Sequence, residues 1–299
     1  MATDNYLCSL CPRDCGRTRD PNNGNGYCHM PSVPRVSLAK LHFGEEPCIS
    51  GTKGSGTIFF TGCSLKCIYC QNSEISGNNI SSGKPADANA LRRIYKDLKD
   101  KGAHNINLVT PTHFAAEIAR SLEISPGIPV CYNTSGYEKP SSLELLRNKV
   151  QIYLTDYKYA LKGPAYRYSS APDYPDVILK ALDRMYDLVG DTEYDSDGIL
   201  QKGIIIRHLI LPGNTDNSLK VIDNVAKFAR DKKIIFSLMA QYTPHGSIEK
   251  YPELQRCITE DEYETVTRRL YSTGLEEGYV QDLSSATDEY LPSFDMSGV

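Results

Sequence analysis

Residues 57–72, TIFFTGCSLKCIYCQN, carry the pattern that decides the fold and chemistry of this chain. The stretch starts with a short apolar run that is typical of a buried strand. It continues into a loop with three closely spaced thiols, Cys63, Cys67 and Cys70, which we call the triplet. Because cytosolic thiols stay reduced, such a group suits a soft metal centre better than a disulfide. Ordinary iron–sulfur clusters use four cysteines, so three indicate a four-iron cluster with one iron left open.

The composition favours a soluble protein of cytoplasmic character. The chain has 299 residues, enough for one large α/β domain and a small appendage, and a formal net charge of −4. Its 33 basic and 37 acidic residues are mixed along the chain, without the basic stripe that nucleic-acid binding requires. The N-terminus has no signal-peptide pattern, and no apolar run approaches the roughly 20 residues of a membrane span. We therefore expect a cytoplasmic protein that binds neither nucleic acid nor membrane.

A second group of cysteines, which we call the quartet, precedes the triplet and consists of Cys8, Cys11, Cys15 and Cys28. A secreted disulfide scaffold would be a shorter chain with a signal peptide, so a metal site is the better interpretation. Four thiols suffice for tetrahedral zinc, with Zn–S bonds of about 2.3 Å, or for a second iron–sulfur cluster. Zinc is favoured because the spacing matches neither ferredoxin pattern, and the cluster stays the alternative. The remaining thiols are expected to be unligated, with Cys131 and Cys257 buried.

From about residue 56, apolar strand candidates alternate with amphipathic helices. Strands are expected at 57–61, 105–109, 128–132, 151–157, 203–211 and 234–240. Helices are expected at 87–101, 112–123, 140–147, 175–189, 217–231 and 259–273. This order indicates a parallel sheet with right-handed crossovers, either an open doubly wound sheet or a barrel that does not close fully.

Polar residues at the strand ends favour the barrel, because active sites in barrels collect at the carboxyl face of the strands. Candidates at these ends are Thr110, Asn133, Thr134, Ser135, Asp156, Lys158, Arg207 and His245. We predict an α/β fold with a partial (β/α)6 barrel of parallel strands over residues 51–250. A small cysteine-rich metal-binding module over 1–50 precedes it. A C-terminal helix and extension over 251–299 is expected to cover the barrel.

These motifs resemble those of the radical S-adenosylmethionine (SAM) superfamily, whose signature is C-x-x-x-C-x-aromatic-C, with Tyr69 as the aromatic residue here. The resemblance covers roughly residues 54–250. Within the superfamily, the chain looks most like the activating enzymes of glycyl-radical enzymes, the group that includes the pyruvate formate-lyase activating enzyme. The matching elements are Gln71-Asn72, Asp156-Tyr157-Lys158 and the run from Arg207 through Pro212-Gly213-Asn214-Thr215-Asp216.

The resemblance implies a [4Fe-4S] cluster on the triplet that reductively cleaves SAM to methionine and a 5′-deoxyadenosyl radical, which abstracts a hydrogen atom. It implies a radical SAM oxidoreductase, a reductant such as flavodoxin or ferredoxin, and a glycyl-radical enzyme as protein substrate. A small molecule or peptide is the alternative substrate. An iron–sulfur electron carrier or metal-dependent scaffold is the non-enzyme alternative. The sequence assigns no catalytic side chain.

The resemblance also implies contacts to SAM. Tyr69 is expected near the adenine and Asp156 near the ribose or a bound cation, while Lys158 and Arg207 offset the carboxylate. Neutral hydrogen bonds are expected from Asn133, Thr134 and Ser135, and His245 is expected near the mouth of the site. One departure stands out, because Thr110-Pro111-Thr112 replaces the Gly-Gly-Glu-type run that receives the SAM amino group. We expect the Thr110 hydroxyl and backbone carbonyls to take that role.

Overall fold

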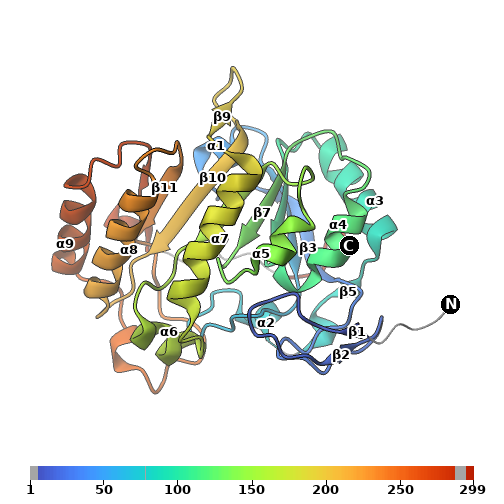
Figure 1. Cartoon of the computed structure of the whole chain (residues 1–299), viewed down its shortest axis with the longest axis horizontal. Helices are drawn as coiled ribbons and strands as arrows, with labels where there is room; N and C mark the ends of the chain where they lie inside the picture. The colour runs from blue at the N-terminus through green and yellow to red at the C-terminus, as the bar shows by residue number, and fades with distance from the viewer. Residues whose placement is uncertain (1–5, 78, 287–293) are drawn as a thin grey trace.

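The computed structural model describes residues 6–77, 79–286 and 294–299, and its centre is a mixed ten-stranded sheet (Figure 1). Across the sheet the strands lie in the order β12 (Gly278–Val280), β11 (Ile235–Met239), β10 (Leu200–Leu209), β8 (Ile152–Asp156), β7 (Val130–Thr134), β6 (Ile106–Val109), β4 (Ser55–Phe60), β3 (Arg35–His42) and β5 (Lys84–Pro85). The short β9 (Glu193–Tyr194) lies off this path and pairs antiparallel with β10.

The middle of the sheet is parallel and winds in one direction. From β4 through β6, β7, β8 and β10 to β11, each strand pairs in parallel with the next one. A doubly wound sheet reverses its strand order at a switch point, whereas this order is that of a barrel. In the described residues the edge strands β12 and β5 do not pair with each other, so the barrel stays open. The predicted partial barrel is confirmed, and all six predicted strands are present.

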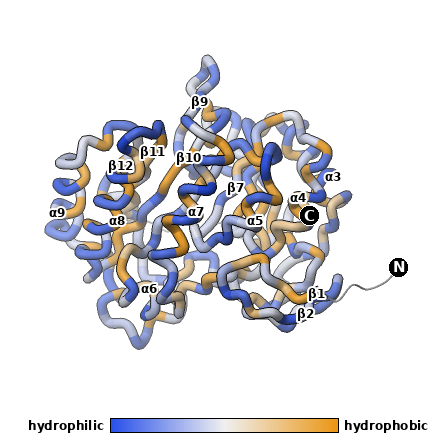
Figure 2. The backbone as a smooth tube through the Cα atoms, viewed as in Figure 1, coloured by the Kyte–Doolittle hydropathy of each residue, from blue (hydrophilic) through white to orange (hydrophobic). Residues whose placement is uncertain are grey.

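Helices cover the outer face of this sheet, with α5 and α7 in front of it in Figure 1. They are α3 (Ala88–Asp100), α4 (Ala115–Ser121), α5 (Pro140–Glu144), α7 (Tyr174–Val189), α8 (Thr215–Phe228) and α9 (Glu260–Tyr271), whereas α6 (Lys162–Ser169) lies beyond the carboxyl ends of the strands, below α7 in Figure 1. Two shorter helices are α1 (Pro47–Ser50) and α2 (Ser73–Ser76), and four 3-10 turns span Ile80–Ser82, Thr112–Phe114, Pro252–Leu254 and Leu283–Ser285. Figure 2 shows apolar colour within the strands and alternating colour along the covering helices, as amphipathic helices on a sheet require.

Helix α3 illustrates how the sequence sets these elements. Leu91, Tyr95 and Leu98 recur at helical spacing and are buried on one face. The Asp87 carboxylate accepts a hydrogen bond from the backbone N–H of Ala90 at 2.8 Å, which caps the first turn. The helix therefore begins and ends within one residue of the predicted range.

The segment before residue 50 contains a strand that sequence analysis did not anticipate. β3 pairs antiparallel with β4, and the Ser37 and Thr61 hydroxyls hydrogen-bond at 2.7 Å. Its period is hard to see in the sequence because consecutive residues from Val36 to Ala39 are all buried. We predicted three units, 1–50, 51–250 and 251–299. Whether they fold independently is not decided by the contacts between them, so this division stays a prediction.

The inner face of the sheet is closed at one end by α1. Cys48 and Ile49 pack there against apolar side chains of the strands, Cys131, Ile152, Leu154, Leu200, Ile205 and Ile235. A larger core lies on the outer face between strands and helices. Because α1 fills the amino-terminal end of the strands, the open space inside the sheet lies toward their carboxyl ends.

The C-terminal end of the described chain lies against the sheet, whereas the N-terminal end packs on the loop that follows β4. The described residues before β3 include the two-stranded ribbon of β1 (Tyr6–Leu7) and β2 (Thr18–Arg19), and Arg13 between these strands bonds to the carbonyl of Ser64. At the other end β12 extends the sheet beyond β11, and the carbonyl of Ser297 accepts a hydrogen bond from the N–H of Ala39 at 3.0 Å. The predictions that concern residues 1–5 and 287–293 lie outside the described residues. None of the described helices is long and apolar enough to span a bilayer.

Candidate functional site

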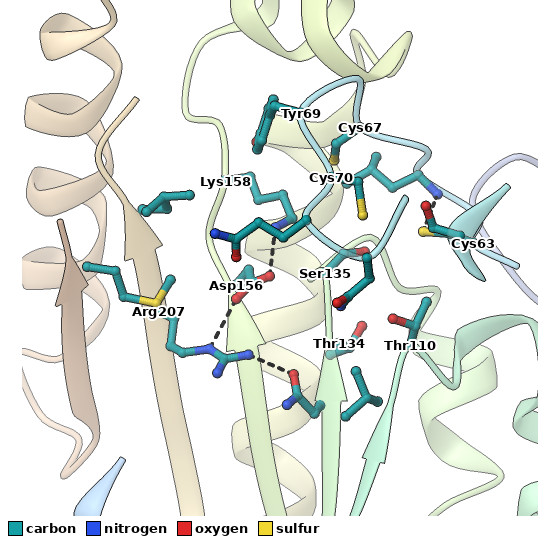
Figure 3. Close-up of a pocket in the computed structure, with 18 of the residues that line it drawn as sticks. Cys63, Cys67, Tyr69, Cys70, Thr110, Thr134, Ser135, Asp156, Lys158 and Arg207 are labelled. Atoms are coloured by element: carbon teal, nitrogen blue, oxygen red, sulfur yellow. Dashed lines mark hydrogen bonds and ion pairs between the residues drawn. The ribbon is translucent and has the colours of Figure 1, made fainter. Parts of the chain in front are cut away.

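A pocket of about 240 Å³ lies at the carboxyl ends of the parallel strands (Figure 3). All but one of the residues predicted to bind the cluster and SAM line it, namely Cys63, Cys67, Tyr69, Cys70, Thr110, Asn133, Thr134, Ser135, Asp156, Lys158 and Arg207. His245 is the exception and does not line the pocket, although Gln241 and Tyr242 from the same loop do. The strand ends converge because neighbouring parallel strands place their carboxyl ends at one edge of the sheet.

The triplet occupies the loop that leaves β4, and its three thiols face the pocket (Figure 3). The N–H of Leu65 donates to the Sγ atom of Cys63 at 3.3 Å, which orients this thiol. Burial, together with the charge of Cys67, raises the pKa of the Cys63 thiol to about 12. A metal bound here must therefore displace the thiol proton, and its affinity will depend on pH.

The donor set of the triplet fits a [4Fe-4S] cluster with one iron left open. Within the described ranges, no three His, Cys, Asp or Glu side chains come close enough to share one metal ion. A [4Fe-4S] cluster binds each cysteine through a different iron, so its ligands need only surround a common space. The three thiols on one loop meet this condition, and they leave one iron for another ligand.

A buried hydroxyl chain supports Cys67 from outside the pocket. The Ser169 hydroxyl at the end of α6 donates to the Cys67 Sγ atom at 3.1 Å. It also shares a hydrogen bond of 2.8 Å with the Tyr159 hydroxyl, which donates to the Tyr69 hydroxyl at 2.8 Å. The Tyr69 ring packs edge-on against Tyr242, with centroids 6.2 Å apart. Hydrogen bonds to a ligating sulfur tune the potential of an iron–sulfur cluster.

The wall opposite the triplet carries a network of charged side chains (Figure 3). The Nε atom of Arg207 lies 3.2 Å from Asp156 Oδ1, and its Nη2 atom donates to Asn133 Oδ1 at 2.7 Å. The Nζ atom of Lys158 lies 2.7 Å from Asp156 Oδ2. Although burial opposes it, the positive charges of Lys158 and Arg207 hold the pKa of Asp156 below its ordinary value. Asp156 is therefore an anion held between two cations before any ligand binds.

Glu45 completes this network and was missed by sequence analysis. Its carboxylate accepts hydrogen bonds from Arg207 Nη1 at 2.8 Å, Asn107 Nδ2 at 2.8 Å and Asn133 Nδ2 at 3.2 Å. The residue lies in the loop between β3 and α1, which places it inside the sheet. The sequence does contain a signal for this residue, the acidic pair Glu45-Glu46 directly before Pro47. Had residues 35–42 been assigned as a strand, this pair would have been recognised as lying at a strand end.

The strand end with Thr110-Pro111-Thr112 has an unusual geometry. Thr110 adopts a φ of 59°, which is rare for a residue other than glycine and is found at functional sites. Thr112 and Thr134 both donate side-chain hydrogen bonds to the buried carboxyl of Glu138. Burial raises the pKa of Glu138 to about 7. The sequence offers no carboxylate at the end of β6, but the fold supplies one behind it from the loop after β7.

The quartet lies apart from the pocket, in turns of the N-terminal segment. Cys8, Cys11 and Cys28 are buried and Cys15 is half-buried. Burial raises the pKa of the Cys11 thiol to about 12, and the other three cysteines contribute to this shift. A side chain at Gly26 would begin 3.0 Å from the Sγ atom of Cys15. All four thiols are thus near one another, but no three of them converge on one point.

The remaining cysteines follow the prediction in part. All ten cysteines are free thiols, and Cys131 is fully buried in the sheet. Cys257 is exposed, so the prediction that it is buried was wrong. It lies between the 3-10 turn Pro252–Leu254 and helix α9, where the chain runs along the surface.

Comparisons with known proteins give one family. The model of the radical SAM superfamily matches residues 57–226, more than half of the chain. An uncharacterized protein of Methanocaldococcus jannaschii is 30% identical over 266 residues, which cover 86% of this chain and 72% of that protein.

The solved structures that resemble this chain share little sequence identity with it. Streptococcus suis SuiB has a TM-score of 0.49 and 13% identity, over 78% of this chain and 50% of SuiB. Methylornithine synthase (PylB) has a TM-score of 0.48 and 11% identity, over 79% of this chain and 74% of that one. A spore photoproduct lyase mutant has a TM-score of 0.49 and 12% identity, over 82% of this chain and 79% of that one. This chain thus spans half the length of SuiB.

Proposed function

Because this chain belongs to the radical SAM superfamily, we propose that it uses SAM-derived radical chemistry to abstract hydrogen from a backbone glycine of a partner protein. The observation that carries the radical chemistry is the triplet, whose three thiols line one wall of an open pocket at the carboxyl ends of the strands. The glycine substrate rests on the resemblance of Gln71-Asn72, Asp156-Tyr157-Lys158 and the run from Arg207 to Asp216 to the activating enzymes of glycyl-radical enzymes.

The residues of the pocket would bind and orient SAM. When bound, the cluster supplies the electron that cleaves SAM to methionine and a 5′-deoxyadenosyl radical. Lys158 and Arg207 would attract the SAM carboxylate, and Asp156 between them keeps both cations in place. Tyr69 would pack near the adenine. Thr110, with its carbonyl and hydroxyl at the strand end, would accept hydrogen bonds from the SAM amino group.

The neutral amides and hydroxyls complete the proposed SAM site. Asn133 is already oriented by Arg207, and Thr134 by Glu138, so both present fixed polar atoms to the pocket. Ser135 lines the same wall. Fixed polar groups lower the cost of ordering a ligand. We leave His245 out of this proposed set, since it does not line the pocket.

A one-electron reductant such as flavodoxin or ferredoxin is the proposed partner for cluster reduction. Reduced thiols at both cysteine groups suit a cytoplasmic location, which we propose as well. The quartet is proposed to bind a second metal, with zinc as the first candidate and an iron–sulfur cluster as the alternative. Metal analysis of a variant with Cys8 and Cys11 replaced by Ala tests this. Loss of zinc from this variant supports zinc at the quartet, whatever its iron content, and unchanged zinc contradicts it.

The radical chemistry is tested by anaerobic reconstitution with iron and sulfide. The spectrum of the reduced cluster should change when SAM is added, and 5′-deoxyadenosine should accumulate after a reductant is supplied. An electron carrier with four protein ligands per cluster would show neither result. The absence of both effects would therefore overturn the enzyme proposal.

The substrate is tested by isotope transfer. Peptides that contain α-dideuterated glycine are incubated with the reconstituted protein, and matched peptides with deuterated L-alanine are the control. Deuterium in the 5′-deoxyadenosine from the glycine peptides alone supports glycine abstraction. Transfer from neither peptide, together with faster 5′-deoxyadenosine formation from a fractionated metabolite mixture, would favour a small-molecule substrate instead. A gene for a glycyl-radical enzyme next to the gene for this chain would point to the partner.

A further inference from the structure

Arg13 lies within the quartet, between Cys11 and Cys15, but its guanidinium binds the loop that carries the triplet. Its Nε atom donates to the carbonyl of Ser64 at 2.9 Å, and its Nη2 atom donates to the carbonyl of Leu65 at 3.2 Å. Both carbonyls belong to the short turn between the first two triplet cysteines. One side chain of the quartet segment thus holds the backbone of the triplet loop.

The same guanidinium also reaches the end of α6. Nη2 donates to the carbonyl of Ser169 at 2.7 Å, and Nη1 donates to the carbonyl of Ser170 at 2.5 Å. Ser169 is the residue whose hydroxyl donates to the Cys67 sulfur. Arg13 therefore joins the triplet loop to the residue that supports one of its thiols.

Arg13 lies in a segment without regular secondary structure, and its position depends on side-chain contacts. Its guanidinium stacks on the rings of Tyr27, at 4.1 Å from the centroid, and Tyr137, at 5.2 Å. The next residue, Asp14, has a φ of 41° and pairs with Lys139 at 2.8 Å. The segment between Cys8 and Cys15 contains no helix or strand. A metal bound by the quartet would tie both ends of this segment together and fix Arg13 in place.

A second arginine of the quartet segment binds the barrel in the same way. Arg19 is 1% exposed, and its Nη1 atom donates to the carbonyl of His113 at 2.5 Å and lies 3.5 Å from the Sγ atom of Cys8. Its Nε atom donates to the carbonyl of Met30 at 3.0 Å. The side chain of Met30 packs on Gly62 so closely that a Cβ there would lie 2.4 Å from its Cγ atom. The quartet segment thus contacts the triplet loop at its start and along its length.

We infer that the quartet is a structural metal centre that controls the triplet. Its metal fixes Arg13 against the triplet loop, and the loop retains its cluster only when this clamp is in place. Arg13 is a positioning residue, since it touches backbone carbonyls and no thiol of the triplet. The inference rests on the proposed metals at both sites, and it adds that filling the first site is required to stabilise the second.

The experiment compares the variants Arg13→Ala, Arg13→Lys, Arg17→Ala and Cys11→Ser of the reconstituted 299-residue chain. Arg13→Ala removes the clamp and leaves the quartet thiols intact. Arg13→Lys keeps the charge but cannot reach four carbonyls with one ammonium group. Arg17→Ala is the matched control, because Arg17 is an exposed arginine of the same segment. For each protein we would measure zinc and iron content, iron loss to a chelator, and the spectrum of the reduced cluster.

We expect Arg13→Ala to keep the quartet metal but to lose triplet iron roughly 10- to 100-fold faster, the usual effect of removing a group that orients metal ligands. Arg13→Lys should behave like Arg13→Ala, and Arg17→Ala like the unmodified protein. Cys11→Ser should lose the quartet metal and show the same faster iron loss. Unchanged iron retention in Arg13→Ala, or in a Cys11→Ser variant that has lost the quartet metal, would overturn the inference while leaving the SAM chemistry intact.

A second measurement does not depend on a loaded cluster. In protein that carries only the quartet metal, the rate at which Cys67 and Cys70 are alkylated reports the order of the triplet loop. We expect faster alkylation in Arg13→Ala than in Arg17→Ala, because the triplet loop then lacks the hydrogen bonds from the guanidinium. Equal rates would contradict the clamp even if the reconstituted protein fails to cleave SAM, so the two proposals fail separately.

Discussion

The triplet and the quartet are built from the same side chain but lie in different surroundings. The triplet lies on the loop that follows β4, and its thiols line a pocket. The opposite wall of this pocket carries charged groups that include Asp156 and Arg207. The quartet thiols lie in turns, and the arginines beside them bind neutral backbone carbonyls of the barrel, as in the contact from Arg19 to His113. The triplet is accessible to a ligand in the pocket, whereas the segment that carries the quartet contacts the rest of the protein.

This difference in surroundings suits a reactive role for the triplet and a structural role for the quartet. A metal centre that reacts needs an open coordination position and a space beside it, whereas a structural centre is closed by protein ligands. Three thiols facing a pocket suit the first kind of centre, and we propose the second kind for the four thiols of the quartet. The hydrogen bonds of Arg13 connect the two, since they run from the quartet segment to the triplet loop.

The largest expected effect comes from breaking the reactive group. Cys67→Ala should abolish 5′-deoxyadenosine formation, because two thiols do not retain the cluster. Cys11→Ala should lower the rate by roughly 10- to 100-fold, as expected for support rather than ligation. Product formation under anaerobic turnover measures both. Cys257→Ala, at an exposed cysteine, is the control and should match the unmodified protein. Equal activity of the first two variants would remove the distinction between the groups.

The next effect concerns the charges opposite the triplet. Arg207→Ala leaves Glu45 without a cation and Asp156 with Lys158 alone, so it should lower the free energy of unfolding by about 3–5 kcal/mol. Arg19→Ala, which removes bonds to neutral carbonyls, should cost about 1–3 kcal/mol.

Anaerobic denaturant unfolding of both metal-loaded variants measures this contrast. Arg268→Ala is the control, because its side chain is 78% exposed and its pair with Glu264 should contribute less than about 1 kcal/mol. A smaller loss for Arg207→Ala than for Arg19→Ala would contradict the view that the paired charges of the pocket contribute more to stability than arginine bonds to neutral carbonyls.

A third effect is pH dependence at Glu138, behind the pocket wall. Burial raises its pKa from 4.5 to about 7 in the folded protein, so the folded state binds the proton more tightly than the unfolded state. Its contribution to stability is fully present below pH 4.5 and is lost as pH rises through 7. From the shift, about 3 kcal/mol is involved.

The variant Glu138→Gln removes this titration. Across the interval from pH 4.5 to about 7, its stability relative to the unmodified protein should therefore rise with pH. Thermal unfolding midpoints of both proteins, measured across this range, provide the test. Parallel pH profiles for the two proteins would show that Glu138 does not titrate there.

The smallest expected effect is a change in the midpoint potential of the cluster, and it distinguishes a hydroxyl near the triplet from one near the quartet. Ser169→Ala removes the hydrogen bond to the Cys67 sulfur, which favours the more negative reduced cluster, so the midpoint potential should fall. Ser142→Ala is the matched control, because its hydroxyl donates to the carbonyl of Leu10 in the quartet segment at 2.7 Å. An anaerobic redox titration followed by electron paramagnetic resonance should show a lower potential for Ser169→Ala alone.

Much of the site was predictable because local spacing carries it. Cys63, Cys67 and Cys70 share one short loop after one strand, and polar residues directly after a parallel strand meet at one edge. The strands from β4 to β11 follow the apolar pattern of the sequence, and the pocket residues from Thr110 to Arg207 follow the strand ends. His245 was the exception, because it comes several residues beyond its strand, where the loop has already turned away.

The groups that sequence analysis missed come from elsewhere in the chain. Glu45 reaches Arg207 across 162 positions, and its strand β3 is buried over consecutive residues, which hides the usual alternation. Glu138 is unremarkable in sequence and becomes a high-pKa carboxyl only through burial between Thr112 and Thr134.

The sequence by itself determined the thiol spacing, the order of strands and helices, and the family. Each of these is written in residues that are close together in the chain. The tertiary structure decided that the strands wind in one direction around a pocket, that Glu45 lies opposite the triplet, and that Arg13 of the quartet segment binds the triplet loop. Hydrogen bonds over such separations depend on how the whole chain closes, so no local pattern specifies them.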